Sequence, residues 1–372
     1  MGDGWAYRYD QNMIRGLKQT HQPSPWINDY GQFAIMPVRD ASAVDENSRA
    51  SWFSHKSETA RPYYYQVYLA DHDINAEITP TERAAAFTFT YPESETSGVI
   101  VDAYDKGSWI KVIPGENAVV GYTTKNSGGV PDNFRNWFVL RFDKDIEGWT
   151  LYDGADNPIP AADEMEGNRI IASVRFKTVR GEKVGVKAAS SFISLEQAWR
   201  NFAEVEALTF EQVKRAAKER WNEVLGRIEI GGGTADQHRT FYSCLYRSLL
   251  FPRKFYEIDA EGKPLHYSPY NGQICDGYLY TDTGFWDTFR ALFPLLNLVY
   301  PSVNEEIQQG LANIARENEF LPEWASPGHR GCMVGNNSAS VVADAIISGV
   351  TPEKDWQILY DCLVYGTEHV HP

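Results

Sequence analysis

The sequence predicts an α+β protein in two successive parts, an N-terminal antiparallel β-sandwich and a C-terminal part built from helices. In residues 1–192, short apolar or alternating runs are separated by turn-forming segments. From about residue 193, apolar residues recur every three or four positions, which is the period of an amphipathic helix. With 372 residues the chain is long enough for more than one domain, and the change of period indicates where the first ends.

The clearest strand signal is "YYYQVYLADHDINAEITPT", which predicts a hairpin. Its apolar residues alternate at Tyr65, Val67 and Leu69, the pattern breaks at 71–73, and it resumes at Ile74. Further strands are predicted for "AAAFTFTYP", "SGVIVDAYD", "NWFVLRFD" and "NRIIASVRFKT", between turn segments such as "PGENA" and "NSGGVPDN". Many short strands at this spacing are typical of an antiparallel sandwich.

Residues 193–235 predict a helical linker. "SLEQAWRNFAEVEAL" and "TFEQVKRAAKERWNEVLGRIEI" have helical periodicity, and Thr209 is a suitable N-cap for the second. The following "GGGTADQ" is interpreted as a flexible connection, because no Gly-Lys-Ser/Thr follows it as in a phosphate loop. The expected division is therefore 1–192, 193–235 and 236–372.

Residues 236–372 are expected to contain five further helices joined as antiparallel hairpins. One is predicted within 283–300, with apolar residues on one face, and Ser302 with Glu305 suggests a capping box for the next. "NSASVVADAIISGV" is almost wholly apolar and small, so we expect it to be buried on most sides. The last, "TPEKDWQILYDCLVYG", begins with a cap at Thr351.

Composition excludes several classes of function. A net charge of −15 argues against a nucleic-acid partner, which requires a basic surface. No apolar run is long enough to span a bilayer, and "MGDGWAYRYD" lacks the features of a signal peptide. The four cysteines lack the close pairs of a zinc site and are expected to be buried as small apolar residues.

The helix predicted within 283–300 is apolar except in its first turn, which carries polar residues at the point where the helix enters the core. Asp287 follows Trp286 directly. One interpretation is structural, because an acid at a helix N-terminus interacts favourably with the helix dipole. The other is functional: an indole covers the C–H face of a pyranose while a carboxylate accepts hydrogen bonds from two hydroxyls.

Two other loops combine aromatic and polar residues in the same way. "LPEWASPGHRGCMVGNNS" contains Glu323, Trp324, Asn336 and Asn337, although Asn336 on its own fits an N-cap. "THQPSPWINDYGQF" places Trp26 among prolines, where it serves either a ligand or the packing of the core. A long, Tyr/Gly-rich loop, "YSPYNGQICDGYLYTDTGF", also precedes the helix itself. These three loops, from two parts of the chain, predict one polyol-binding pocket at their junction.

Glycoside hydrolysis requires two carboxyl groups on opposite sides of a sugar, farther apart for inversion than for retention. Four acids near these loops are candidates, but the sequence alone assigns no pair: Asp282, Asp287, Glu323 and Asp344. Of these, Asp344 is expected to bond a neighbouring backbone group. The chain has neither a Gly-x-Ser-x-Gly nor a His-Glu-x-x-His motif.

Taken in order, "GFWDTFRALFPLLNLVYP", "LPEW" and "GCMVGNNSASVVADAIISGV" resemble the conserved blocks of glycoside hydrolase family 92, which comprises calcium-dependent exo-α-mannosidases. "QPSPWINDYGQFAIMPV" and "SHKSETARPYYYQVYLADHDINAEITPTERAAAFTF" resemble its N-terminal domain. The resemblance covers nearly the whole chain. It implies a β-sandwich, a helical linker and the first helices of an (α/α)6 barrel.

The resemblance also implies a site and a reaction. Asp287 would contact hydroxyls of a terminal mannose, Trp26 would line the same subsite, and Trp286 and Arg290 would hold the Asp287 turn. The reaction implied is single-step hydrolysis with inversion of α-linked mannose in an oligosaccharide or glycoprotein glycan, with Ca²⁺ gripping two mannose hydroxyls. The general acid, the base and most calcium ligands would follow the end of this chain. The chain is thus expected to be an internal fragment, incomplete at both ends and inactive alone, and the family's habit is secretion or a periplasmic location.

Two alternatives remain open from the sequence. The aromatic loops alone would suit a non-catalytic carbohydrate-binding module that binds mannose through Trp26. The β half is also similar to a sugar-binding, mutarotase-like sandwich, but fold analogy alone implies no activity. A purely structural or interaction module would instead bury both Trp26 and Trp286 away from any cavity. The sequence does not determine the glycosidic linkage or the oligomeric state.

Overall fold

The computed structural model describes residues 9–19, 21 and 29–372. It separates into two units, which we call the sandwich unit (residues 1–127 and 135–222) and the helical unit (residues 128–134 and 223–372). The predicted boundaries at residues 192 and 235 stay predictions. Among the described residues, no helix combines the length and apolar character needed to cross a bilayer.

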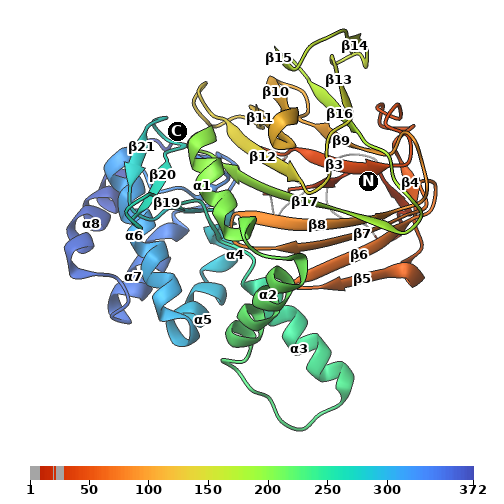
Figure 1. The fold of residues 1–372 in the computed structure, drawn as a ribbon. Coiled ribbons are helices and arrows are strands. Elements are labelled where there is room, and N and C mark those ends of the chain that lie inside the picture. Colours follow the sequence, from red (N-terminus) through yellow and green to blue (C-terminus); the bar gives the residue numbers. More distant parts are fainter. Residues whose placement is uncertain (1–8, 20, 22–28) are drawn as a thin grey trace. The chain divides into compact units, whose positions relative to one another are not determined.

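The sandwich unit contains two large antiparallel sheets (Figure 1). The nine-stranded sheet has the order β15 (Glu164–Gly167), β10 (Ser108–Ile113), β11 (Ala118–Thr123), β12 (Asn136–Phe142), β17 (Glu182–Ser191), β8 (Ala84–Tyr91), β7 (Ile74–Pro80), β6 (Tyr64–Leu69) and β5 (Glu58–Arg61). The six-stranded sheet has the order β14 (Pro158–Ile159), β13 (Gly148–Tyr152), β16 (Ile171–Arg175), β9 (Gly98–Asp102), β3 (Ala34–Val38) and β2 (Leu17–Lys18). A short pair, β1 (Met13–Ile14) and β4 (Ser51–Trp52), completes the unit, and the predicted hairpin is β6–β7.

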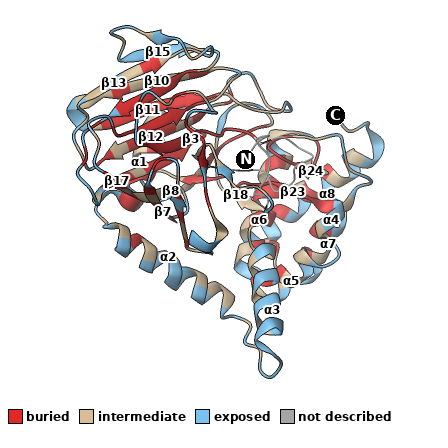
Figure 2. Cartoon of the chain, turned by 90° about the vertical axis from the view of Figure 1, so that its right-hand side faces the viewer, coloured by how far each residue is buried: buried red, intermediate tan, exposed pale blue. Residues whose placement is uncertain are grey.

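The two large sheets bury one continuous apolar core between them. Alternate residues point into it because side chains on a strand have a period of two, as Val67, Leu69 and Ile74 do at no measurable exposure. The opposite face of the nine-stranded sheet is covered by α1 (Leu195–Glu206), whose Ala198 and Phe202 pack on Val139. The central strands are therefore buried on both faces (Figure 2).

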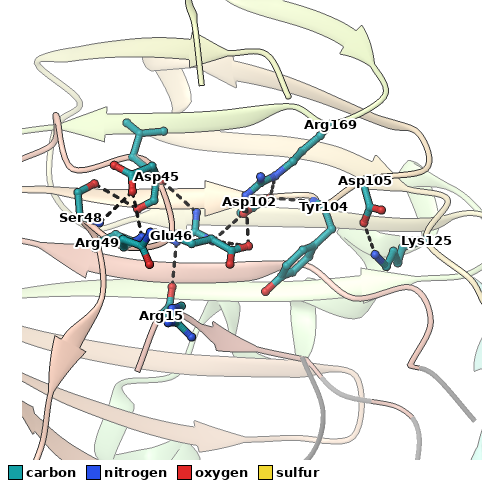
Figure 3. Close-up of polar contacts among 12 residues, drawn as sticks. Arg15, Asp45, Glu46, Ser48, Arg49, Asp102, Tyr104, Asp105, Lys125 and Arg169 are labelled. Atoms are coloured by element: carbon teal, nitrogen blue, oxygen red, sulfur yellow. Dashed lines mark hydrogen bonds and ion pairs between the residues drawn. The ribbon is translucent and has the colours of Figure 1, made fainter. Parts of the chain in front are cut away.

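A buried ion cluster lies inside the sandwich unit (Figure 3). Asp102, 1% exposed, binds Arg49 at 2.7 Å and Arg169 at 2.6 Å. Burial by itself raises the pKa of Asp102, but the hydrogen bond from Arg169 and the charge of Arg49 outweigh burial, so its pKa lies below the usual value. The backbone N–H of Tyr104 donates a further hydrogen bond to this carboxylate.

The helical unit contains α3 (Ala235–Ser248), α4 (Phe285–Thr288), α5 (Leu292–Val299), α6 (Pro301–Glu317), α7 (Asn337–Ile347) and α8 (Glu353–Glu368). The two units are connected through α2 (Phe210–Leu225). Thr209 caps α2 as predicted, because its Oγ1 accepts from the N–H of Gln212 while the Gln212 side chain bonds the Thr209 N–H.

Short strands stand where the sequence suggested a loop before α4. They form a pair, β18 (Arg253–Lys254) with β22 (Tyr280–Thr281), and a three-stranded sheet, β19 (Glu257–Ile258), β20 (Pro264–Tyr267) and β21 (Ile274–Asp276). A third group pairs β23 (Thr283–Gly284) with β24 (Trp324–Ala325).

Three expectations about the helices are wrong. The apolar helix is broken between α4 and α5, because the ring of Pro294 would clash with the carbonyl of Arg290 if the helix continued. The capping box at Ser302 does not form, since α6 already begins at Pro301 and Tyr300 provides no side-chain cap. The last helix begins at Glu353, so Pro352 rather than Thr351 occupies its N-cap position.

The burial of α7 and of the cysteines also differs from expectation. The α7 helix buries one stripe, which includes Val341 and Val342, while Ile347 is 85% exposed. Its apolar composition does not report burial, because small apolar residues are also common on surfaces. Of the cysteines, Cys362 is buried, whereas Cys244 and Cys332 are exposed and Cys275 is partly buried.

Candidate active site

The β23–β24 pair joins two of the predicted loops within the helical unit. Thr283 pairs with Ala325 and Gly284 with Trp324, and the N–H of Phe285 donates to the carbonyl of Glu323 at 3.1 Å. Two segments about forty positions apart in the sequence therefore run side by side, as the labels of β23 and β24 show in Figure 2.

Gly284 allows an indole and a carboxylate to approach the same point. A Cβ on this residue would lie 2.4 Å from Cε3 of Trp324 and 3.1 Å from Oδ2 of Asp287, so a larger residue would displace them. Asp287 lies in the four-residue helix α4 and is exposed. The sequence analysis paired Asp287 with Trp286 and Trp26, whereas in the structure Trp324 also lies near Asp287, across Gly284.

Trp286 and Arg290 interact with each other next to this point. The guanidinium of Arg290 lies 5.0 Å from the centre of the Trp286 ring and 4.5 Å from that of Phe289. Its Nη1 also donates to the carbonyl of Trp286 at 2.5 Å. These contacts constrain the turn that carries Asp287, while Trp286 remains 41% exposed and is available for stacking.

Glu323 and the two asparagines form a second group. The Glu323 carboxylate accepts from the N–H of Asn337 at 3.2 Å, which satisfies one of the free donors at the start of α7. Burial raises the pKa of Glu323 and this hydrogen bond opposes the shift. Asn336 occupies the N-cap position, but its side chain caps no N–H and instead accepts from the hydroxyl of Ser338 at 3.0 Å.

The second group opens into a hollow of about 350 Å³. This volume falls within the range of small-molecule sites, roughly 300–1,000 Å³. The hollow mixes apolar walls with carboxylate, guanidinium and amide groups, and its lining residues include Phe320, Leu321, Glu323, Arg330, Met333, Asn336 and His371. Asp287, Trp286, Trp324 and Asn337 are not among the lining residues, so Glu323 and Asn336 are the predicted site residues that face the hollow.

The other two candidate acids hold structural positions. Asp282 is fully buried, its Oδ2 lies 3.1 Å from Nε of Arg253, and its Oδ1 accepts from Ser326 at 3.3 Å. Asp344 accepts from the side-chain amide of Asn297 at 2.8 Å rather than from a backbone group, which corrects the expectation. Arg253 and Ser326 carried no motif that would have identified them, although Asp282 adopts a positive φ of 63° that marks a constrained turn.

Among the described residues, no three acidic side chains converge as a calcium site would favour. Calcium prefers six to eight oxygen ligands. The single group of three potential ligand side chains found among the described residues includes neither Asp287 nor Glu323. Its ligand atoms are nitrogen, sulfur and oxygen. Trp26 lies outside the described residues, so its predicted place beside Asp287 stays a prediction.

Comparison with known families places these elements among the glycosidases. Residues 1–191 match the glycosyl hydrolase family 92 N-terminal domain and residues 197–372 match the family 92 catalytic domain. The chain belongs to glycosyl hydrolase family 92.

Solved structures agree with this assignment. A family 92 inverting mannosidase from Bacteroides thetaiotaomicron is 45% identical and has a TM-score of 0.95 over 100% of this chain. A family 92 α-mannosidase from the same organism, in complex with mannoimidazole, is 27% identical with a TM-score of 0.88 over 97% of the chain. In each case the chain spans 50% of the relative's length.

A curated relative, an uncharacterized secreted glycosidase of Arthroderma benhamiae, is 24% identical over 87% of the chain and 41% of its own length. The structure thus has the family 92 fold, with a β-rich N-terminal domain and a helical C-terminal part.

Proposed function

We propose that this chain supplies the mannose-recognising part of an inverting exo-α-mannosidase that removes terminal α-linked mannose from oligosaccharides or glycoprotein glycans. The observation that carries the proposal is the approach of Asp287 and Trp324 over Gly284. A carboxylate beside an aromatic plane suits a pyranose, which presents hydroxyls at its rim and C–H groups on its face. The inverting mannosidase that is 45% identical supports the same substrate class and stereochemistry.

In the proposed reaction, water attacks the anomeric carbon as the bond to the leaving oxygen breaks. A general acid gives its proton to that oxygen, and a base takes a proton from the attacking water. We assign neither role within this chain. Asp287 accepts from two sugar hydroxyls, Trp286 and Trp324 offer stacking surfaces, and Arg290 holds the turn.

Glu323 and Asn336 are proposed to contact the substrate from the neighbouring hollow, and Asn337 from the start of α7 next to Glu323. The raised pKa of Glu323 would suit a proton donor, but its Oε2 already accepts from the start of α7, which favours a binding role.

Asp287→Asn tests the proposal. In the full-length protein, kcat/KM for release of mannose from an α-linked disaccharide should fall roughly 100-fold, because two charge-assisted hydrogen bonds worth about 1.5–3 kcal/mol each are weakened. Asp361→Asn, at an exposed position on α8, is the matched control and should retain full activity. Equal activity of Asp287→Asn and the control would refute the assignment.

Calcium and location belong to the proposal as well. Loss of activity in a chelator, restored by Ca²⁺, would support the calcium dependence that the family resemblance implies. Export of the protein would agree with the name of the fungal relative, a secreted glycosidase.

The alternative of a non-catalytic carbohydrate-binding module makes a different prediction. It requires the 372 residues alone to bind mannose and Trp26→Ala to abolish that binding, whereas the mannosidase proposal expects the chain to be inactive and weak in binding by itself. Calorimetry with mannose therefore separates the two.

A further inference from the structure

A histidine, a cysteine and a glutamate converge in the helical unit away from the candidate active site. His266 on β20 and Cys275 on β21 are cross-strand partners, so their side chains lie on the same face of the hairpin. Glu317, the last residue of α6, reaches the same face. One potential ligand atom from each of the three side chains lies within 4.8 Å of the other two.

The hydrogen bonds of His266 prepare its ring to act as a ligand. The ring is fully buried, and its Nδ1 lies 2.9 Å from the carbonyl oxygen of Gly277. A carbonyl only accepts, so Nδ1 carries the hydrogen and Nε2 faces Glu317 Oε1 at 2.8 Å. A backbone carbonyl that orients Nδ1–H is the usual support of a metal-bound histidine.

Glu317 is the second feature of this cluster that suits a metal ion. Its side chain is 8% exposed, and its second oxygen, Oε2, is buried without a hydrogen-bond partner. Leaving a buried carboxylate oxygen unpaired is unfavourable. The ion pair with His266 satisfies Nε2 and Oε1, and the thiol of Cys275 also bonds the Glu317 carboxylate, so all three side chains already meet at one point.

We propose that His266, Cys275 and Glu317 bind a zinc ion that ties the β20–β21 hairpin to the end of α6. A nitrogen, a thiolate and a carboxylate are ligands that zinc accepts, whereas calcium takes oxygen. Water completes a tetrahedral set. Zinc–ligand bonds of roughly 2.0–2.3 Å place neighbouring ligand atoms about 3.3–3.7 Å apart, so side-chain rotations are enough to close the site. The role is structural and does not depend on the proposed mannosidase activity.

Cobalt provides a direct probe of this site. Co²⁺ added to the metal-free chain should bind at about one equivalent and give a thiolate-to-cobalt charge-transfer band together with tetrahedral ligand-field bands, both removed by added Zn²⁺. Cys275→Ser should abolish the charge-transfer band, and Glu317→Gln should weaken zinc binding at least tenfold. Cys244→Ser, which removes an exposed thiol on α3, is the matched control and should behave as the unmodified chain.

Thermal unfolding gives a second readout, which also shows whether each variant is folded. At free zinc about a hundred times Kd, the midpoint should rise by roughly 5–10 °C in the unmodified chain and in Cys244→Ser, but not in Cys275→Ser. A folded chain that binds no metal, which would leave only the His266–Glu317 ion pair, overturns the proposal. Metal binding that is unchanged in Cys275→Ser also overturns the proposal, because adventitious binding at His369 and His371 would give that result.

Discussion

The sandwich unit and the helical unit bury their side chains in different ways. In the sandwich, apolar residues of two sheets face each other, and even the charged Asp102 is enclosed between two arginines. In the helical unit, each helix buries one stripe while large apolar side chains remain open, with Leu298 at 83% and Tyr360 at 64% exposure (Figure 2).

The difference follows from what each kind of element needs from its neighbours. A strand alternates between two faces, so a pair of sheets can enclose one apolar face of each. A helix presents a broad apolar stripe, which a single neighbouring helix covers only in part. Several neighbours are needed to bury it completely. Exposed apolar surface on successive helices is typical of a face that binds other protein segments. Three substitutions, each with a control, test this contrast through their effects on the stability of the two units.

The largest effect on stability is expected from Asp102→Asn in the sandwich unit. Removing the charge leaves Arg49 and Arg169 without their buried carboxylate and with only the more exposed Glu46 near both of them. Breaking a buried ion pair in this way costs about 3–5 kcal/mol. Hydrogen exchange of the β9 amides measures the free energy of opening of this unit separately from the helical unit.

Glu164→Gln is the matched control, because Glu164 forms an exposed ion pair with Lys111 at 2.8 Å. Exposed pairs contribute about 0–1 kcal/mol. If both substitutions have the same small effect, the enclosed charges do not stabilise the sandwich.

A smaller effect, dependent on pH, is expected in the helical unit at His329. Burial, helped by the charge of His371, lowers the pKa of His329 to about 4, and its Nε2 bonds the side-chain amide of Asn318. In the unfolded chain, His329 is therefore protonated below about pH 6.5. In the folded chain it is protonated only below about pH 4. Stability should fall as the pH falls between these values, by up to roughly 2 kcal/mol from pH 7 to pH 5.

Denaturant unfolding at pH 7 and pH 5 measures this loss. His329→Gln retains an amide for hydrogen bonding but cannot titrate, so its stability should change less over the same interval. A loss of equal size in His329→Gln would assign the pH dependence to other groups.

The parts of the fold that the sequence predicts are those specified by local patterns. The β6–β7 hairpin and the capped start of α2 lie where alternation and Thr209 indicated them. The break before α5 runs against a strong apolar period, which alone predicts a continuous helix, because the clash of Pro294 outweighs that period.

Within the site, residue types were predictable but their partners were not. Asp287 and the tryptophans are predicted as site residues from their unusual place in the sequence, whereas the β23–β24 pairing that brings Trp324 to Asp287 depends on long-range hydrogen bonds. The same holds for His266 and Cys275, whose spacing matches no metal motif and which meet only through cross-strand register. Local periodicity contains no information about either pairing.

The smallest effect is expected from Leu298→Ala on α5, and it tests whether the open apolar side chains contribute to the stability of this unit. Leu298 is 83% exposed, so its loss should change stability by no more than about 0.5 kcal/mol. Phe293 on the same helix is 1% exposed, and Phe293→Ala should cost about 3–5 kcal/mol by removing core contacts. Urea unfolding of the two variants measures both effects within one helix. A cost for Leu298→Ala that approaches that of Phe293→Ala would mean that another surface covers this face of α5 in solution. The open apolar side chains of the helical unit would then reflect which surfaces pack against its helices, rather than a difference between helices and strands.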